Sequence, residues 1–522
     1  MRSSFVKYLG IANLLILSTN PGASADPTAL TEYPAADWIN EQLQEFKLRP
    51  KDFLNSHKSV EKLDPITSKP ISSISLFSKE QIADESFVEK KIQQKNHLLM
   101  SLSFSEPELM PNSAIQRNDA PENLVDTYSV NTLEHMERSG LRAQQLKSQP
   151  WSDYYWATYQ GGLANRYADP RFPRSKIWSE NIDYIFSHSC SVETLSPAEK
   201  YDLLVGDPRW TMTRSVVADA QRYVKADGTI EPWMGICHGW AAAAFMMNRP
   251  QNSITVLAAD GRTKIPFFPS DLKALGSMLW ATTSPPSRFI GGRCNDQNPA
   301  QDELGRVLSQ NCFDTNPGTW HLAVVNQIGV AQRSMIMDAT FDYEVWNQPI
   351  YAYSYSYFNP ITQKAVNTLS EALVRKDQFS QDRFKSYRHP RTAFMVGVVM
   401  KAVYVAETLP QKTSKDPPEL DKLVAVKYIY DLELDSEHRI IGGEWYTNKH
   451  PDFLWVPPVG TSPVSEGDKI LNQRGSRAPG RWNPQTEAVP SAWAEAAKVS
   501  SRYRQPLTRI VDSLFELSHF GL

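Results

Sequence analysis

The spacing of apolar residues divides this chain of 522 residues into segments of different character. Residues 149–456 carry closely spaced aromatic and β-branched runs, so we expect the hydrophobic core there. Residues 26–148 are rich in Ser, Lys, Glu, Asn and Pro and show only short helical patterns, as at residues 38–43. Such a segment has little core of its own. We interpret it as a propeptide that covers an active site or as a polar N-terminal spacer.

A long strand is predicted near the end of the core region. Between Val424 and Leu434 every second residue is apolar, and charged residues stand between several of them. This alternation is typical of a half-buried strand. Polar residues at 436–439 then predict a turn that leads back into the run Gly442-Gly-Glu-Trp445.

The C-terminal segment, residues 457–522, begins with several turn-forming residues and ends with a helical pattern. Ile510, Leu514 and Leu517 recur at spacings of four and three residues. We therefore expect a surface linker followed by a helical tail.

The first 25 residues have the pattern of an export signal. Arg2 and Lys7 precede an apolar run that ends at Leu17, and small residues precede a cleavage position after Ala25. The run is too short to span a bilayer, so we expect a secreted or periplasmic protein with no membrane partner. The net charge of −3 and the absence of a basic, aromatic-interleaved stripe argue against nucleic acid as a partner.

Cys237 is the first candidate for chemistry. Gly235 suits a tight turn, and residues 241–247 are mostly strong helix formers, so Cys237 is expected in the first turn of a helix. The unpaired N–H groups and the positive dipole end of that turn favour a thiolate. His238 cannot act on this sulfur, because neighbouring residues on a helix point about 100° apart. A base must therefore come from another element.

His321 and Asp338 are the candidates for that base and its partner. They lie in two apolar runs, and Gly329-Val330 between them can form a two-residue type II′ hairpin turn. In that register the two residues face each other across the strands, so a carboxylate could orient the imidazole. A nucleophile on a helix with base and acid on a sheet predicts an α+β fold with a papain-like or transglutaminase-like core. The alternative without catalytic function is an ordinary, exposed His–Asp pair on a sheet.

Several spaced motifs resemble those of the transglutaminase elicitor family, a family of secreted proteins. They are Trp151-Ser-Asp-Tyr-Tyr-Trp, Gly235-Ile-Cys-His-Gly-Trp-Ala, Asn316-Pro-Gly-Thr-Trp-His, Met337-Asp-Ala-Thr, Glu344-Val-Trp-Asn-Gln-Pro and Gly442-Gly-Glu-Trp. The resemblance spans roughly residues 150–456. It implies a protein-glutamine γ-glutamyltransferase made as a preproprotein, with a Cys–His–Asp triad at Cys237, His321 and Asp338. Asp342, Glu344 and Asn347 are lesser candidates for the acidic position.

The implied reaction joins glutamine and lysine side chains of protein substrates through a thioester on Cys237. Trp233 and Trp320 lie close to the candidate residues in the sequence and are candidates for contacting the substrate. The acidic side of the strand at 424–434 could hold Ca²⁺, although a solvated acidic face is the simpler interpretation. Of the other cysteines, Cys294 and Cys312 would close a short loop as a disulfide, which leaves Cys190 over.

Two other functions fit the same residues. A secreted papain-like cysteine protease or deamidase would use the same triad. A non-catalytic surface-binding or elicitor protein would need none of it. Labelling of casein with an amine probe without cleavage separates the transferase from the protease. A non-catalytic protein would keep its elicitor or adhesion activity after Cys237→Ala.

Overall fold

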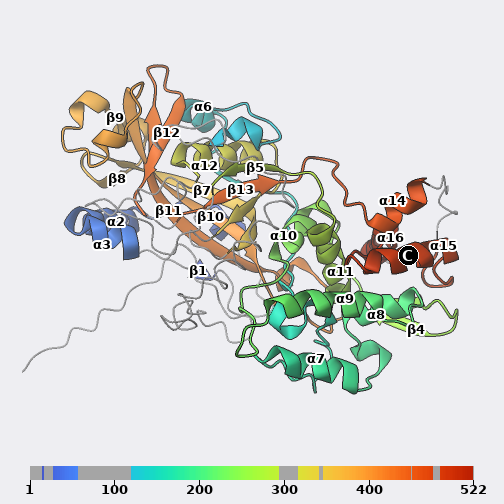
Figure 1. Cartoon of the computed structure of the whole chain (residues 1–522). Coiled ribbons are helices and arrows are strands. Elements are labelled where there is room, and N and C mark those ends of the chain that lie inside the picture. Colours follow the sequence, from blue (N-terminus) through green and yellow to red (C-terminus); the bar gives the residue numbers. More distant parts are fainter. Residues whose placement is uncertain are drawn as a thin grey trace, which may run out of the picture.

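The computed structural model describes residues 15–16, 27–56, 119–292, 315–339, 345–447, 450–473 and 482–520. The fold combines a large antiparallel sheet with a group of helices beside it (Figure 1). This confirms the predicted mixture of helices and antiparallel strands.

The main sheet has the order β1-β11-β10-β7-β6-β13-β5, and short strands pair outside this path. Three strands of 13 residues form its centre, and the strand pairs among the described residues are antiparallel. The strands are β1 (Leu15–Ile16), β2 (Ala143–Gln145), β5 (Arg288–Gly291), β6 (Ile336–Asp338), β7 (Asn347–Asn359), β8 (Lys364–Val366), β9 (Leu373–Arg375), β10 (Phe394–Ala406), β11 (Lys422–Leu434), β12 (Ile440–Trp445) and β13 (Phe453–Val456). A separate hairpin joins β3 (Ile254–Leu257) and β4 (Lys264–Phe267).

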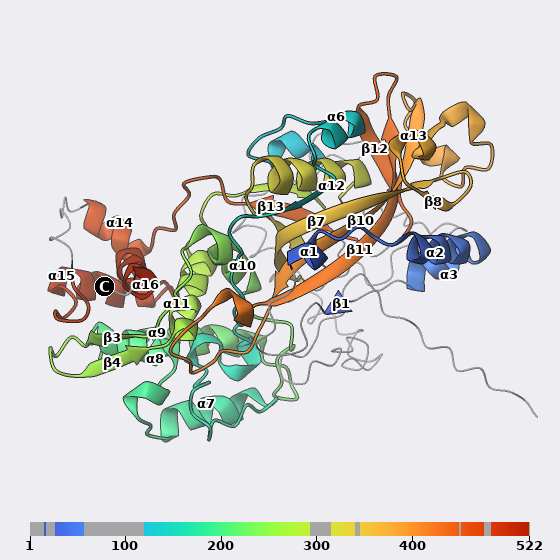
Figure 2. The same cartoon turned by 180° about the vertical axis from the view of Figure 1, so that it is seen from behind.

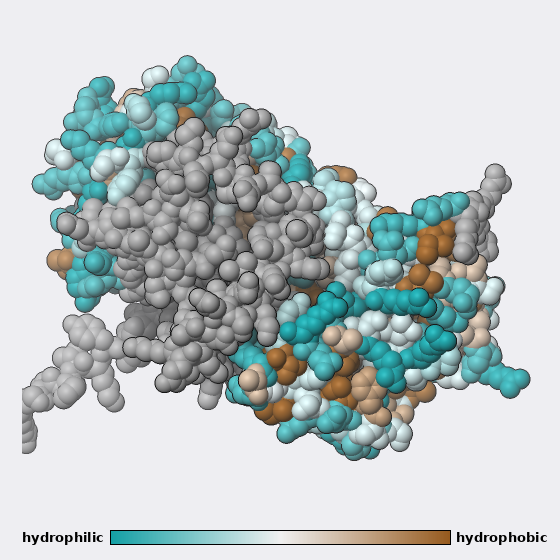
Figure 3. Space-filling model, in the orientation of Figure 1, coloured by the Kyte–Doolittle hydropathy of each residue, from teal (hydrophilic) through white to brown (hydrophobic). Residues whose placement is uncertain are grey.

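The helices lie on both faces of this sheet and in a group at one end of it (Figure 1). They are α1 (Pro27–Leu30), α2 (Ala36–Leu48), α3 (Pro50–Ser56), α6 (Leu133–Arg138), α7 (Trp178–Ser187), α8 (Pro197–Leu204), α9 (Thr211–Ala220), α10 (Cys237–Met246), α11 (Pro269–Thr282), α12 (Pro317–Val324), α13 (Leu369–Ala372), α14 (Glu466–Gln473), α15 (Ser491–Ser501) and α16 (Thr508–Phe520). On the face seen in Figure 3, the helical group carries mostly polar side chains, with small groups of apolar side chains among them.

The strand and turn predicted at residues 424–445 are confirmed as the pair β11–β12. The expectation of a half-buried strand is wrong, because both faces are covered. Tyr428 packs against Trp320 of α12 on one face, and Ile429 packs with residues of α2 on the other. The acidic side chains are therefore not solvated: Asp431 and Glu433 are both buried and both pair with Arg388. A calcium site at this face loses its support.

The hairpin predicted around Gly329-Val330 is wrong. His321 lies in α12, and Val325–Val330 continue it as a π-helix, η9. Asp338 lies on β6, which pairs with β7 and β13. The β-branched residues of this run are buried in the core, where burial rather than strand propensity determines the conformation.

The core also extends beyond the boundaries expected at residues 149 and 456. Leu124, Leu133 and Met136 lie in the main hydrophobic cluster, and so do Ile510 and Leu514 of the predicted helical tail. The N-terminal segment before α2 runs along the sheet, where Ser354 and Ser356 of β7 donate hydrogen bonds to its backbone (Figure 2).

Candidate active site

Cys237 begins α10, as the sequence predicts. The chain reaches this point through Gly235, where an added Cβ would lie 2.2 Å from the carbonyl oxygen of Tyr155. Only glycine permits this approach, and the next residue, Ile236, donates its N–H to the same carbonyl at 2.8 Å. The turn before Cys237 is thereby fixed to the aromatic segment around Tyr155.

The alanines of α10 hold the helix against its neighbours. Residues 241–244 are buried, and α10 contacts both α11 and the strand β7. Gly239 allows the close approach of α11, because an added Cβ would lie 2.1 Å from the carbonyl oxygen of Ser277. Small side chains thus place the first turn of α10, and its sulfur, directly on the sheet.

The sulfur of Cys237 lies between a carbonyl and an amide. The Sγ–H donates to the carbonyl oxygen of Val345 at 3.6 Å, and Nδ2 of Asn347 donates to Sγ at 3.6 Å. Only 5% of Cys237 is exposed. These contacts fit a neutral thiol at rest, and the dipole of α10 stabilises the thiolate once the proton leaves.

Asp338 lies on the neighbouring strand, beside Asn347. The two residues are paired across β6 and β7, and paired side chains stand on the same face of the sheet. Oδ1 of Asp338 accepts the backbone N–H of Trp346 at 2.8 Å. Asp338 is fully buried. The structure therefore brings Asp338 to the strand pair that contacts Cys237.

The described contacts of His321 are with tyrosines of the sheet. Its Nδ1 lies 2.9 Å from the hydroxyl of Tyr430, and its ring packs edge-on against Tyr355 and Tyr430. Burial lowers the pKa of His321 to about 3, so the ring is neutral near pH 7. None of its contacts within the described residues is with Cys237 or Asp338.

The predicted substrate-contacting tryptophans differ in their surroundings. Trp233 is half-buried just before Cys237 and donates its Nε1–H to Glu231 at 2.6 Å. Trp320 is fully buried beneath the surface, against Tyr428. Trp233 thus lies close to Cys237 in the chain, whereas Trp320 is part of the core around His321.

Two residues of this site have roles that the sequence did not predict. The sequence indicates Asn347 only as a candidate for the acidic position, and it indicates no role for Trp455, which ends the family-like stretch Pro451-Asp-Phe-Leu-Trp. Trp455 of β13 donates its Nε1–H to Oδ1 of Asn347 at 2.7 Å. Asn347 lies in the motif Glu344-Val-Trp-Asn-Gln-Pro, but no local signal in the sequence links it to Trp455. Asp342 and Glu344 lie outside the described residues.

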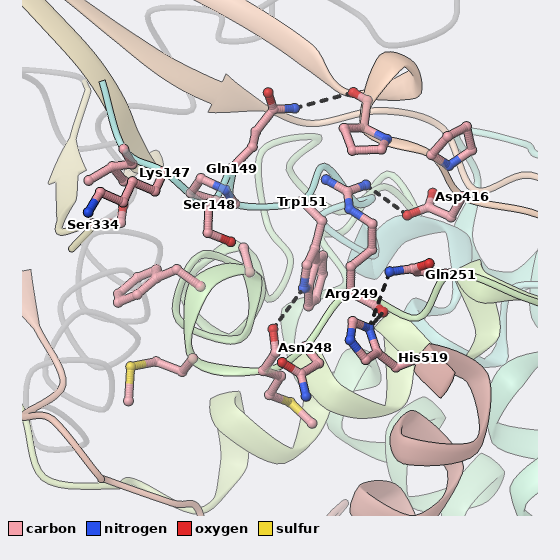
Figure 4. A pocket seen from close by; sticks show the side chains of 18 of the residues that line it. Lys147, Ser148, Gln149, Trp151, Asn248, Arg249, Gln251, Ser334, Asp416 and His519 are labelled. Carbon is pink, nitrogen blue, oxygen red and sulfur yellow. Dashed lines mark hydrogen bonds and ion pairs between the residues drawn. The ribbon is translucent and has the colours of Figure 1, made fainter. Parts of the chain in front are cut away.

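A large cavity lies at the other end of α10. It has a volume of about 710 Å³ and is lined by residues such as Trp151, Met246, Arg249, Asp416 and His519 (Figure 4). None of the predicted site residues lines it. Arg249 in its wall is held by Asp416 at 2.9 Å, so this charge is already compensated.

Neither Cys190 nor Cys237 is in a disulfide, and Cys294 and Cys312 lie outside the described residues. Within the described ranges no three His, Cys, Asp or Glu side chains converge as a metal site. No described helix has the length and apolar character that crossing a membrane requires.

Comparison with known proteins provides the family. A family model described as "Transglutaminase elicitor" matches residues 123–465, well over half of the chain. A similar solved structure is the GP42 transglutaminase from Phytophthora sojae, at 21% identity, with a TM-score of 0.44 and coverage of 63% of this chain and 86% of that one. No curated protein matches. The extent of the family match shows that this chain belongs to the transglutaminase elicitor family.

Proposed function

We propose that this chain is a protein-glutamine γ-glutamyltransferase whose nucleophile is the thiol of Cys237. One observation carries the proposal: in a chain of this family, a cysteine begins a helix and its sulfur contacts Asn347, the strand partner of Asp338. The proposed substrates are protein glutamine and lysine side chains. Export, a propeptide within residues 26–148 and a papain-like core remain predictions of this account.

The proton of the thiol goes to a base before attack. Asp338 is the proposed acceptor, because the strand pairing places its carboxylate on the face that carries Asn347. His321, the base expected from the sequence, contacts Tyr430 instead. In this proposal His321 is a core residue, which packs α12 against Tyr355 and Tyr430 of the sheet.

The Cys237 thiolate then attacks the γ-carboxamide carbon of a glutamine. A C–S bond forms, and the carbonyl electron pair moves to oxygen. When the carbonyl re-forms, the C–N bond breaks, and the nitrogen leaves as ammonia with the proton taken from the thiol. A lysine amine attacks the thioester in the same way, loses a proton, and releases the thiol with formation of the isopeptide bond.

The test is incorporation of a fluorescent primary amine into casein by the protein and by Cys237→Ala. The proposal predicts labelling without cleavage by the parent and no labelling by the variant. The matched control is Cys190→Ala, since Cys190 is also outside any disulfide but lies on the helical side of the fold. Cleaved casein would favour the protease. Labelling of casein by Cys237→Ala would show that Cys237 is not the nucleophile.

A further inference from the structure

The amide of Asn347 has a fixed orientation. The indole Nε1–H of Trp455 can only donate, so its partner at 2.7 Å must be the acceptor atom Oδ1. The oxygen and nitrogen of an asparagine amide are otherwise difficult to assign. Here the indole determines the assignment, and the NH₂ group is left directed at the sulfur of Cys237, 3.6 Å away.

Trp455 and Asn347 are both held in place by paired strands. Trp455 is 3% exposed and lies on β13, which pairs with β5 and β6. Asn347 begins β7 and pairs with Asp338. A donor held in this way needs little reorganisation during a reaction, which is the property that makes hydrogen-bond donors effective in catalysis.

We infer that Asn347 is a catalytic residue whose Nδ2–H₂ stabilises first the Cys237 thiolate and then the oxyanion, and that Trp455 is the positioning residue that holds the amide in this orientation. The oxyanion of the tetrahedral intermediate is two bonds from Sγ. A donor in contact with Sγ is therefore within reach of that oxygen after a small movement. The inference rests on the proposed function and assigns it a side-chain oxyanion donor.

The same donor serves both halves of the reaction. In acylation the oxyanion forms as the C–S bond forms and disappears as the C–N bond to ammonia breaks. In deacylation it forms again when the amine attacks the thioester and disappears as the C–S bond breaks. No proton leaves Asn347 in either half, so the amide contributes hydrogen bonds alone.

The test uses Asn347→Ala, Trp455→Phe, and both together in the full chain. Removing one such donor typically lowers kcat by about 10²- to 10³-fold. We expect Asn347→Ala to lose this amount with little change in KM, and Trp455→Phe to lose less. The double variant should be no slower than Asn347→Ala, because Trp455 acts through Asn347. Additive losses, or a kcat for Asn347→Ala equal to that of the parent, would overturn the inference.

Trp280→Phe is the matched control. Trp280 and Trp455 line the same small cleft beside His238, and Trp280 is also buried. Its Nε1 has no hydrogen-bond partner among the described residues, so this variant loses an indole N–H without loss of a contact to Asn347. We expect it to keep the kcat of the parent. Equal losses in Trp280→Phe and Trp455→Phe would contradict a positioning role.

A second readout separates this inference from the proposed function. The rate of thiol alkylation by iodoacetamide, followed against pH in a background in which Cys190, Cys294 and Cys312 are replaced by alanine, reports the pKa of Cys237 without any turnover. Asn347→Ala and Trp455→Phe should both move this profile to higher pH, because the thiolate loses a donor. An unmoved profile would count against the inference even if amine transfer is observed. A moved profile without amine transfer would support the contact and contradict the proposed function.

Discussion

Cys237 and His321 both lie against β7, but in different surroundings. Cys237 has a helix N-terminus and a side-chain amide beside it, which stabilise the charged form of the thiol. His321 has two tyrosines, and burial stabilises the neutral form of its ring. Donors that stabilise a charged form therefore lie beside the cysteine and not beside the histidine.

Asp338→Asn and His321→Gln test this assignment. If Asp338 accepts the thiol proton, Asp338→Asn should lower kcat for amine transfer by about 10²- to 10⁴-fold. His321→Gln can keep a hydrogen bond to Tyr430 and should keep most of the activity of the parent. Far-UV circular dichroism checks that both variants fold. The opposite ranking of the two kcat values would restore His321 as the base.

The candidate site was predicted from the sequence only in part. Cys237 could be placed at a helix start because Gly235 and the alanines after it act locally. Asp338 was chosen for a hairpin that does not exist, and its place beside Asn347 comes from the pairing of β6 with β7. The Asn347–Trp455 contact joins residues 108 positions apart, and no local pattern encodes such a distance.

Because the ring of His321 is buried and neutral, the free energy of unfolding should depend on pH. Its pKa is lowered from 6.5 to about 3, so the unfolded chain binds the proton more readily than the folded one. The stability that depends on the neutral ring is complete above pH 6.5 and is lost as the pH falls towards 3. The slope for one proton is at most about 1.4 kcal/mol per pH unit. Urea unfolding of the parent and His321→Gln between these pH values should show curves that converge at low pH, whereas parallel curves would contradict a neutral buried ring.

At the scale of elements, α12 shows why a strand was predicted where a helix lies. Val324, Val325 and Ile328 favour strands by propensity, but all three are buried in the core. The sequence nevertheless contains two signals for the start of α12. Asn316 caps α12 by accepting the N–H of Gly318 at 2.9 Å, and Pro317 occupies the first position. These two signals were local and outweighed the apparent strand pattern.

The helix α2 provides a prediction at the same scale. Phe46 is 2% exposed and its ring lies 4.6 Å from that of Tyr446, whereas Leu48 on the same helix is 67% exposed. Phe46→Ala should lower the free energy of unfolding by about 3–5 kcal/mol. Leu48→Ala should change it by less than about 0.5 kcal/mol. Similar values in chemical denaturation would mean that α2 does not pack on the sheet as described.

At the scale of the whole molecule, the sheet and the helical group share one core. The main cluster runs from Leu124 through the central strands to Leu514 of α16. Composition alone suggested a polar N-terminal region and a peripheral tail, because polar residues dominate the sequence of both segments. Within the described residues, apolar side chains from both segments, such as Leu133 and Ile510, nevertheless enter the main core, and tertiary packing determines this.

Leu514→Asp tests whether α16 is part of that core. Leu514 is fully buried, so a carboxylate there would be desolvated or would expose the core, at a cost of several kcal/mol. Phe520→Asp is the control, because Phe520 is 60% exposed at the end of the same helix. Differential scanning calorimetry should show a much lower Tm for Leu514→Asp than for Phe520→Asp. Equal Tm values would show that the C-terminal helices fold separately from the rest.

The central claim is that Cys237 transfers the acyl group of a glutamine to an amine. Its most direct test is mass spectrometry of a glutamine peptide incubated with a lysine peptide and either the parent protein or Cys237→Ala. The account predicts a joined product that has lost one ammonia, formed by the parent alone. Two unchanged peptides with the folded parent, or the same joined product with the variant, would contradict it.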